Sequence, residues 1–308
     1  MRTPLQLIGS ITLALLATTA HASQSLDLAL DLAKTKAYRS KDVDWSGVER
    51  QVRVIEASQG EDAAIRFVVS TLDDKHTSYR APTQSAFTPS RTKAIPSDIA
   101  ITLPSTKLTP ALQINRWAGK DQAGATKTVR SALNGILDRQ PCGLILDFSA
   151  NSGGNMWPML VGLSPLLSEG QLGAFRSSNQ AGNRIEKTNG FITVGGRPHF
   201  LNYPSMAAPQ ADTPYIAIII GRKSASSGEI TPLMFYGQEN VKFFGHKTAG
   251  FTSANQVFPL PNGGTLVLTT SMTEDRNGHT HPDGIQPDII SDLPFEDASK
   301  WLSQQCSG

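Results

Sequence analysis

The sequence predicts an α/β fold in which a partly parallel sheet and its helices follow a small N-terminal helical region. Segments with strand-like and helix-like patterns alternate from residue 111 onward. Two of the strand-like segments, 142–148 and 215–220, are almost wholly apolar, which is typical of strands that are buried on both faces. Before them, residues 25–72 carry apolar side chains at helical spacing.

The composition is that of an ordinary globular protein. The 308 residues include 28 Lys and Arg against 26 Asp and Glu, giving a net charge of +2, and 39% of them are hydrophobic. A chain of this length forms one large domain or two smaller ones. A charge so close to balance gives no indication of a nucleic-acid partner.

The first 22 residues have the pattern of a secretory signal peptide. A basic residue, Arg2, precedes an apolar run from Leu5 to Ala17, and the small-residue site Ala20-His21-Ala22 follows. We expect cleavage after Ala22 and a periplasmic or secreted mature chain without a membrane span. ATP and coenzyme A are not expected as substrates in such a compartment.

Cys142 and Cys306 are the two cysteines of the chain. In an oxidising compartment they can pair and hold the carboxyl terminus in place, and the alternative is two free or buried thiols. Neither has metal-ligating neighbours in the sequence, so we expect no metal site.

Residues 23–80 form the predicted helical region. Apolar residues recur at helical spacing over 25–59 and again over 61–72. Residues 81–97 are rich in Pro, Ser and Thr without periodicity, and we interpret them as a loop or linker. Residues 98–308 then form the α/β core.

Strands and helices are predicted to alternate within this core. Strands are expected at 111–117, 142–148, 173–175, 191–194, 215–220, 241–245, 257–260 and 265–270, and helices at 125–139, 156–167 and after Ser226.

The chain is organised around the turn that follows the strand at 215–220. This turn, Gly221 to Gly228, is small and polar, and it opens a helix with Glu229 in its first turn. A serine at such a strand-to-helix corner presents its hydroxyl beside unpaired backbone N–H groups, as a nucleophilic serine requires. Ser226 is our candidate nucleophile, and the alternative is a helix cap made of small residues.

A second glycine-bearing corner, Asn151 to Asn155, follows the other apolar strand. Because ligands bind outside the carboxyl ends of the strands in α/β sheets, both corners are expected to face the same crevice. The N–H groups of Gly153 and Gly154, with that of Ser226 or Ser227, are candidate donors of an oxyanion hole. The alternatives are a tight turn or a phosphate-binding loop, and no phosphate-loop motif supports the latter.

A nucleophilic serine needs a base, and His76 is our candidate. It stands directly after a predicted helix, close to Asp73 and Asp74, where the chain leaves regular structure. Taken singly, such a histidine is more often a capping or surface residue. We interpret His279 and His281 as part of a solvated turn rather than as a metal pair.

Five segments together resemble the tail-specific, or C-terminal processing, serine peptidases and their tricorn-core relatives. They are LDDKHT at 72–77, GLILDFSANSGGN at 143–155, SASSGE at 224–229, GHKTAG at 245–250 and GIQPDI at 284–289. They occur in the order of that family and span most of the mature chain. The resemblance implies the α/β spiral of ββα units that these peptidases share with Clp-protease and crotonase proteins.

The resemblance also implies roles for particular residues. Ser226 falls at the position of the family's nucleophile, and Gly153, Gly154 and the Ser227 amide fall at those of its oxyanion donors. The tricorn-like branch uses a histidine in the segment that carries His76 here.

The acid that orients this histidine is left open by the resemblance. Glu274, Asp275 and Asp283 lie near the expected place, and we prefer Asp275. Two departures are evident: Phe251 stands where dyad-type members have a catalytic lysine, and residues 78–110 are too few for a PDZ domain. The second departure weakens any inference of tail specificity.

We therefore expect a periplasmic or secreted serine peptidase that hydrolyses peptide bonds through an acyl-enzyme, with His76 taking the proton of Ser226. Its partner is a peptide or protein substrate, and no cofactor is expected. One alternative is a non-catalytic protein that binds a ligand or peptide on the same scaffold. The other is a crotonase-like acyl-thioester enzyme, against which the signal peptide argues. The sequence leaves the oligomeric state open.

Overall fold

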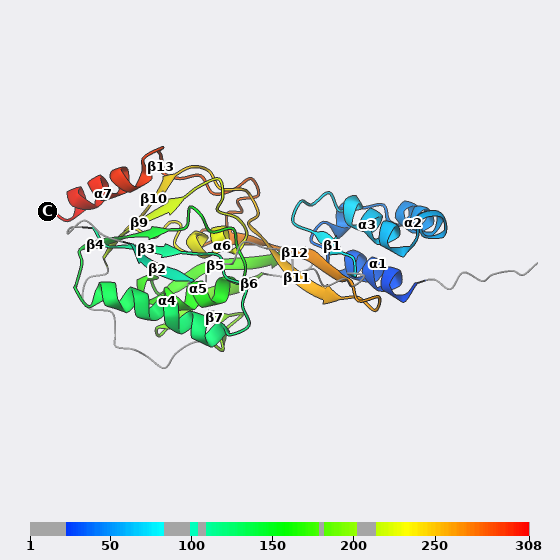
Figure 1. Cartoon of the computed structure of the whole chain (residues 1–308), viewed down its shortest axis with the longest axis horizontal. Helices are drawn as coiled ribbons and strands as arrows, with labels where there is room; N and C mark the ends of the chain where they lie inside the picture. Colours follow the sequence, from blue (N-terminus) through cyan, green and yellow to red (C-terminus); the bar gives the residue numbers. More distant parts are fainter. Residues whose placement is uncertain (1–22, 83–98, 104–108, 179–181, 202–213, 308) are drawn as a thin grey trace, which may run out of the picture.

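The structure, a computed structural model, describes residues 23–82, 99–103, 109–178, 182–201 and 214–307. A helical region stands beside an α/β core, and two strands reach from the core to the helices (Figure 1). The expected signal peptide and nearly all of the expected loop at 81–97 lie outside the described residues. Among the helices described, none combines the length and the apolar character needed to cross a membrane.

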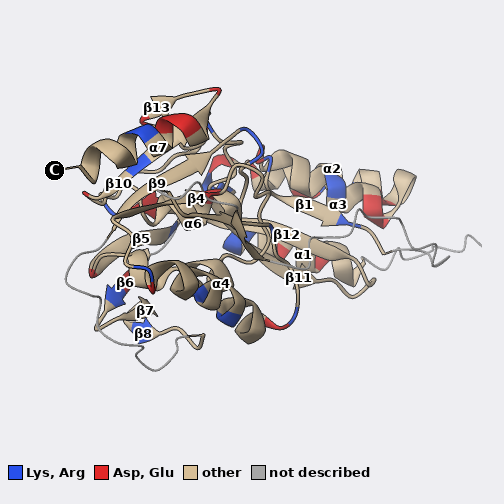
Figure 2. Ribbon diagram, turned by 60° about the vertical axis from the view of Figure 1, so that its left-hand side comes forward, with Lys and Arg blue, Asp and Glu red and all other residues tan. Residues whose placement is uncertain are grey.

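Three helices form the N-terminal region: α1 (Gln24–Lys36), α2 (Trp45–Gln59) and α3 (Glu61–Thr71), with a short 3₁₀ turn, η1 (Ser40–Asp42), after the first. Their starts follow from capping residues. The Ser23 hydroxyl accepts the N–H of Leu26, and the Asp44 carboxylate accepts two N–H groups at the start of α2. Acidic and basic residues both lie on these helices (Figure 2), and some pair, as Lys34 does with Glu49.

The three helices do not complete their hydrophobic core by themselves. Their buried aliphatic residues pack with Tyr79 of β1 (Ser78–Arg80) and with Leu266 and Leu268 of the hairpin formed by β11 (Ser253–Pro259) and β12 (Thr265–Asp275). Amphipathic helices bury one face each, and the hairpin supplies the apolar surface that they need. The hairpin therefore fastens the helical region to the core (Figure 1).

The core is built on a six-stranded sheet with the order β13-β10-β9-β4-β3-β2. Its strands are β2 (Ala100–Leu103), β3 (Ala111–Ile114), β4 (Gly143–Asp147), β9 (Tyr215–Ile220), β10 (Val241–Gly245) and β13 (Ile289–Ile290). Neighbouring strands are parallel except β2 and β3, which are antiparallel. The predicted α/β fold with a partly parallel sheet is confirmed.

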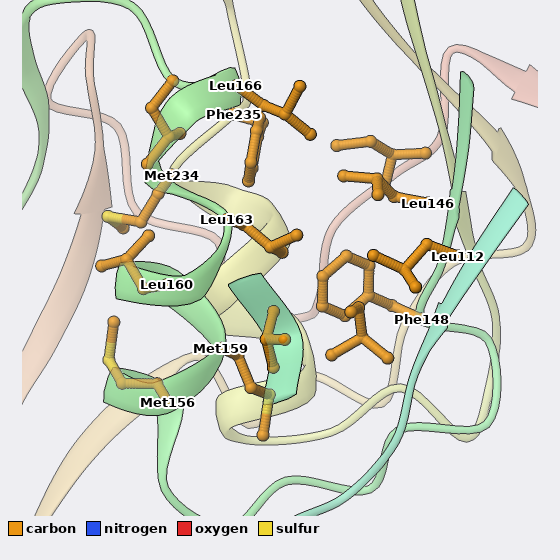
Figure 3. Close-up of a cluster of buried hydrophobic side chains, with 14 of the residues drawn as sticks. Leu112, Leu146, Phe148, Met156, Met159, Leu160, Leu163, Leu166, Met234 and Phe235 are labelled. Carbon is orange, nitrogen blue, oxygen red and sulfur yellow. The ribbon is translucent and has the colours of Figure 1, made fainter. Parts of the chain in front are cut away.

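Both faces of this sheet are buried, as the apolar strands predict. On one face, Ile216 and Ile218 of β9 join the cluster formed with α4 (Gln122–Leu137), α5 (Met156–Gly162) and α6 (Ser227–Leu233), part of which is shown in Figure 3. On the other face, Ala217 and Ile219 pack against α7 (Pro294–Gln305). Consecutive residues of β9 thus pack against helices on opposite faces of the sheet.

A second sheet, antiparallel throughout, has the order β1-β12-β5-β6-β7-β8, with β11 also paired to β12. Its other strands are β5 (Gly170–Ser177), β6 (Asn183–Thr188), β7 (Phe191–Val194) and β8 (Arg197–Pro198), and the 3₁₀ turn η2 (Ser164–Leu166) precedes them. The long strand β12 pairs with β1 along 265–267 and with β5 along 271–275. It therefore runs from the helical region into the core.

Cys142 and Cys306 form a disulfide, with their Cα atoms 5.8 Å apart. Cys142 directly precedes β4, and Cys306 directly follows α7. The bond therefore holds the C-terminal helix against the sheet on which it packs. Of the two alternatives that the sequence leaves open, the structure shows the paired one.

We expect replacement of both cysteines by serine to lower the free energy of unfolding by about 2 to 4 kcal/mol, because the bond restricts the unfolded chain. Urea unfolding of the oxidised wild type and of the C142S/C306S variant measures this difference. A reductant should destabilise the wild type and leave the double variant unchanged. Equal stability of the two oxidised proteins would contradict a bond between these residues.

Candidate active site

Ser226 lies at the corner between β9 and α6 in a strained backbone conformation. It is the N-cap of α6, with φ 55° and ψ −124°, which is outside the regions that residues with a side chain normally occupy. A serine on a sharp, strained strand-to-helix turn is the arrangement called a nucleophile elbow, which exposes the hydroxyl at the edge of a sheet. Ser226 is partly exposed, as this arrangement requires.

The glycine corner at 151–155 packs directly against the serine corner. A Cβ atom on Gly153 would lie 2.9 Å from the Cβ of Ser226, and one on Gly154 would overlap the carbonyl oxygen of Trp117. Both glycines also have positive φ, 106° and 113°. The Ser227 hydroxyl donates to the carbonyl oxygen of Gly154 at 2.7 Å. The two corners are therefore held together by packing and by a hydrogen bond.

The three predicted oxyanion donors are not equivalent. The N–H of Gly153 donates to Oδ1 of Asn151 at 3.0 Å, so it stabilises its own turn. Within the described residues, no hydrogen bond takes the N–H of Gly154 or that of Ser227. These two amides are the ones left to bind a developing negative charge.

Glu229 connects the serine corner to the loop at 246–252. Its carboxylate is fully buried and accepts the N–H of Ser226 at 3.0 Å, as the N3 glutamate of a capping box does. It also accepts the N–H groups of Gly250 at 2.8 Å and of Phe251 at 2.7 Å, together with the hydroxyl of Thr248. The sequence analysis placed Glu229 in the first helical turn but missed this second role.

His76 is held at the end of a turn that its neighbours form. The Asp74 carboxylate accepts the N–H groups of His76 and Thr77, each at 3.1 Å, and the Thr77 hydroxyl at 2.6 Å. Nδ1 of the His76 ring lies 2.8 Å from Oγ of Ser253, and the ring meets the Phe251 ring edge-on at a centroid distance of 5.2 Å. Burial lowers the pKa of His76, and the charge of Asp74 opposes this effect.

His76 and Ser226 are brought to the same region through Phe251. The ring of Phe251 packs on His76, while its N–H and that of Ser226 donate to the same oxygen of Glu229. No hydrogen bond joins the imidazole to the Ser226 hydroxyl in this arrangement. Catalytic hydrogen bonds are often long in ligand-free sites and tighten with substrate.

Asp275 is not the partner of the His76 ring. It lies fully buried at the end of β12, where the strand pairs with β5, and its carboxylate accepts from Nε2 of His281 at 2.9 Å. His281 is therefore mostly buried rather than part of a solvated turn, while His279 is exposed. Asp275 contacts His281 rather than His76 because β12 extends beyond Met272, where its pairing with β11 ends.

The other two candidate acids do not contact His76 either. Glu274 forms an ion pair with Arg176, and no hydrogen bond or ion pair of the described residues links Asp283 to the imidazole. The contact that the ring does make, with Ser253, was missed by the sequence analysis.

We expect Glu229→Gln to lower the free energy of unfolding by about 2 to 3 kcal/mol, because the amide offers one oxygen where the carboxylate offers two, and its NH₂ group meets N–H donors. Glu239→Gln is the matched control, since this exposed glutamate lies between α6 and β10 and should tolerate the change. Urea unfolding compares the two variants with the wild type. If Glu229→Gln is as stable as the control, the four hydrogen bonds do not hold the corner.

Comparison with known proteins places the chain in a family. Residues 109–291 match the model of peptidase family S41, a region that contains Ser226 and both glycines but not His76. The chain is 37% identical over 166 residues to the nisin-resistance protein of Lactococcus lactis subsp. lactis. That alignment covers 53% of this chain and 50% of the relative, so the chain spans about half the length of the curated relative that it matches.

Solved structures show the same fold over nearly the whole chain. A lipoprotein from Streptococcus agalactiae is 25% identical and superposes with a TM-score of 0.76 over 96% of this chain and 100% of its own. The photosystem II D1 C-terminal processing protease, 13% identical, has a TM-score of 0.62 over 90% of this chain and 96% of its own, which supports the fold alone. Since the family model matches more than half of the chain and the fold agrees, the chain belongs to peptidase family S41.

Proposed function

We propose that this protein is a serine peptidase in which Ser226 is the nucleophile and His76 the general base. The observation that carries the proposal is the strained backbone of Ser226 at a strand-to-helix corner, next to the amides of Gly154 and Ser227. Membership of peptidase family S41 supports the same chemistry. Strain of this kind costs stability, and it persists where the surrounding structure holds it for a function.

The proposed reaction follows from these groups. Nε2 of His76 takes the proton of Ser226 as the hydroxyl oxygen attacks a peptide carbonyl, and the imidazolium then protonates the leaving amine. The tetrahedral oxyanion accepts hydrogen bonds from the N–H groups of Gly154 and Ser227, each of which contributes several kcal/mol when aimed correctly. Water then hydrolyses the acyl-enzyme by the same proton transfers in reverse.

The proposed place of action is the periplasm or the outside of the cell, after cleavage behind Ala22. The disulfide between Cys142 and Cys306 supports an oxidising compartment, where such bonds form and persist. The substrate is a peptide or protein. The name of the Lactococcus lactis relative makes nisin the first compound to incubate with the protein.

A non-catalytic peptide-binding protein is the second candidate. Two observations favour it: no hydrogen bond joins His76 to Ser226, and no carboxylate contacts the imidazole among the described residues. Labelling by a fluorophosphonate, which reacts with activated serines, separates the two candidates.

We expect the wild type to be labelled at Ser226 and to hydrolyse peptides, and the Ser226→Ala and His76→Ala variants to do neither. Ser227→Ala is the matched control: it keeps the backbone N–H and loses only the hydrogen bond to Gly154, so it should remain active and be about 1 kcal/mol less stable. Mass spectrometry of the labelled peptide and thermal unfolding measure both effects. Exchanged behaviour of the two serine variants would place the nucleophile at Ser227, and absence of labelling at any pH would favour the binding protein.

The pH dependence of the reaction should reflect His76. Burial lowers the pKa of its imidazole, and only the neutral ring accepts a proton, so the acid limb of kcat/KM should have its midpoint below the usual histidine value of 6.5. The folded protein then binds this proton less tightly than the unfolded chain does, so protonation of His76 at lower pH should also reduce stability. Peptide hydrolysis measured across the pH range tests this. A midpoint above 6.5 would show that the charge of Asp74 outweighs burial.

A further inference from the structure

We infer that Ser253 is a positioning residue of the active site, whose hydroxyl occupies the place beside Nδ1 of His76 that a carboxylate holds in a Ser-His-Asp triad. This inference rests on the proposed function, because it assigns the orientation of the proposed base.

The contact between the two side chains is short. Oγ of Ser253 lies 2.8 Å from Nδ1 of His76, and Ser253 is 7% exposed. Ser253 is the first residue of β11 and pairs there with Met272 of β12. Since β12 is fixed in the second sheet, the hydroxyl is presented by a rigid element, as a positioning group must be.

The His76 residue is held at its backbone as well as at its ring. Its N–H donates to Asp74, and its carbonyl oxygen accepts from Nδ2 of Asn255 at 3.1 Å. Asn255 lies two residues after Ser253 on β11, so one strand holds both the backbone and the ring. The ring of Phe251 packs edge-on against the imidazole as well.

The proposed role of His76 requires one tautomer of its imidazole. A neutral imidazole carries one N–H, and the nitrogen without it is the one that can act as a base. Nδ1 lies beside the Ser253 hydroxyl, which can accept a hydrogen bond from it, and the backbone of Ser253 raises the pKa of His76. When Nδ1 carries the proton and donates it to Oγ of Ser253, Nε2 is left free to accept the proton of Ser226.

A hydroxyl differs from a carboxylate in what it does to the imidazolium. It fixes the ring but adds no negative charge, so it stabilises the protonated form less. The charged groups that act on the ring are Asp74, which raises its pKa, and Lys75, which lowers it. No carboxylate of the described residues bonds to the ring, and the one that the sequence suggested, Asp275, serves His281.

The first test compares full-length Ser253 variants and a matched control by peptide hydrolysis across the pH range. Ser253→Ala should lower kcat about tenfold or more with little change in KM, because the ring loses its orientation while the substrate site is intact. Ser253→Thr keeps the hydroxyl and should restore kcat to within a few fold of the wild type. Ser271→Ala, a buried serine of β12 opposite Ala254, is the matched control and should behave as the wild type.

The pH profile distinguishes orientation from general damage. Ser253→Ala should move the acid limb to lower pH, and Ser253→Asp should move it to higher pH by about one unit or more, since a carboxylate stabilises the imidazolium. A variant that is merely misfolded does not produce shifts of opposite sign.

A second measurement does not depend on activity. NMR of the full chain with labelled histidine side chains, in the Ser226→Ala background, reports the tautomer and the titration of His76 with and without the Ser253 hydroxyl. An unchanged His76 signal in Ser253→Ala, or a kcat within twofold of the wild type, overturns the inference. If the wild type is neither labelled by a fluorophosphonate nor active, the proposed function fails, while the NMR result still decides whether Ser253 orients the ring.

Discussion

The buried carboxylate of Glu229 is the interaction on which the geometry of the site depends. It accepts hydrogen bonds from the backbone of Ser226 and from the backbone of Gly250 and Phe251, so one side chain determines how the serine corner meets the following loop. A buried charge is tolerated because each of its oxygens is satisfied by N–H or O–H donors. The hydrogen bond from the N–H of Ser226 to Glu229 also holds the strained backbone of Ser226. The conformation of the corner is therefore a property of the core rather than of a mobile loop.

The imidazole of His76 is positioned by other elements of the structure. It belongs to the helical region, which completes its hydrophobic core with the β11–β12 hairpin. The same hairpin provides Ser253 and Asn255, which contact the ring and the backbone of His76. The pairing of β11 with β12 thus both completes the hydrophobic core of the helices and positions His76. The site is assembled where this hairpin and the loop held by Glu229 converge, with Phe251 in contact with both.

The parts of the site that could be predicted from the sequence are those with local signals. The apolar run before Ser226 and the small polar turn after it identify a buried strand and a corner without any knowledge of the fold. The partner of His76 has no such signal, because it depends on how β11 and β12 pair. The strand that the sequence predicts at 265–270 continues to Asp275 through residues that are polar except for Met272, and this extension brings the Asp275 carboxylate to His281. Helix α7 was likewise missed, although Phe295, Ala298, Trp301 and Leu302 recur at helical spacing in its sequence.

The disulfide divides the proposed machinery into two parts. Ser226, Gly154 and the hairpin lie between Cys142 and Cys306, within a segment closed by a covalent bond. His76 lies outside that closed segment, and hydrogen bonds and packing hold its ring against it. Separation of the helices from the hairpin would withdraw the imidazole and leave the serine corner intact. Under the proposed mechanism, local opening abolishes activity while most of the tertiary structure survives, so the lifetime of the activity and global unfolding are two separate quantities.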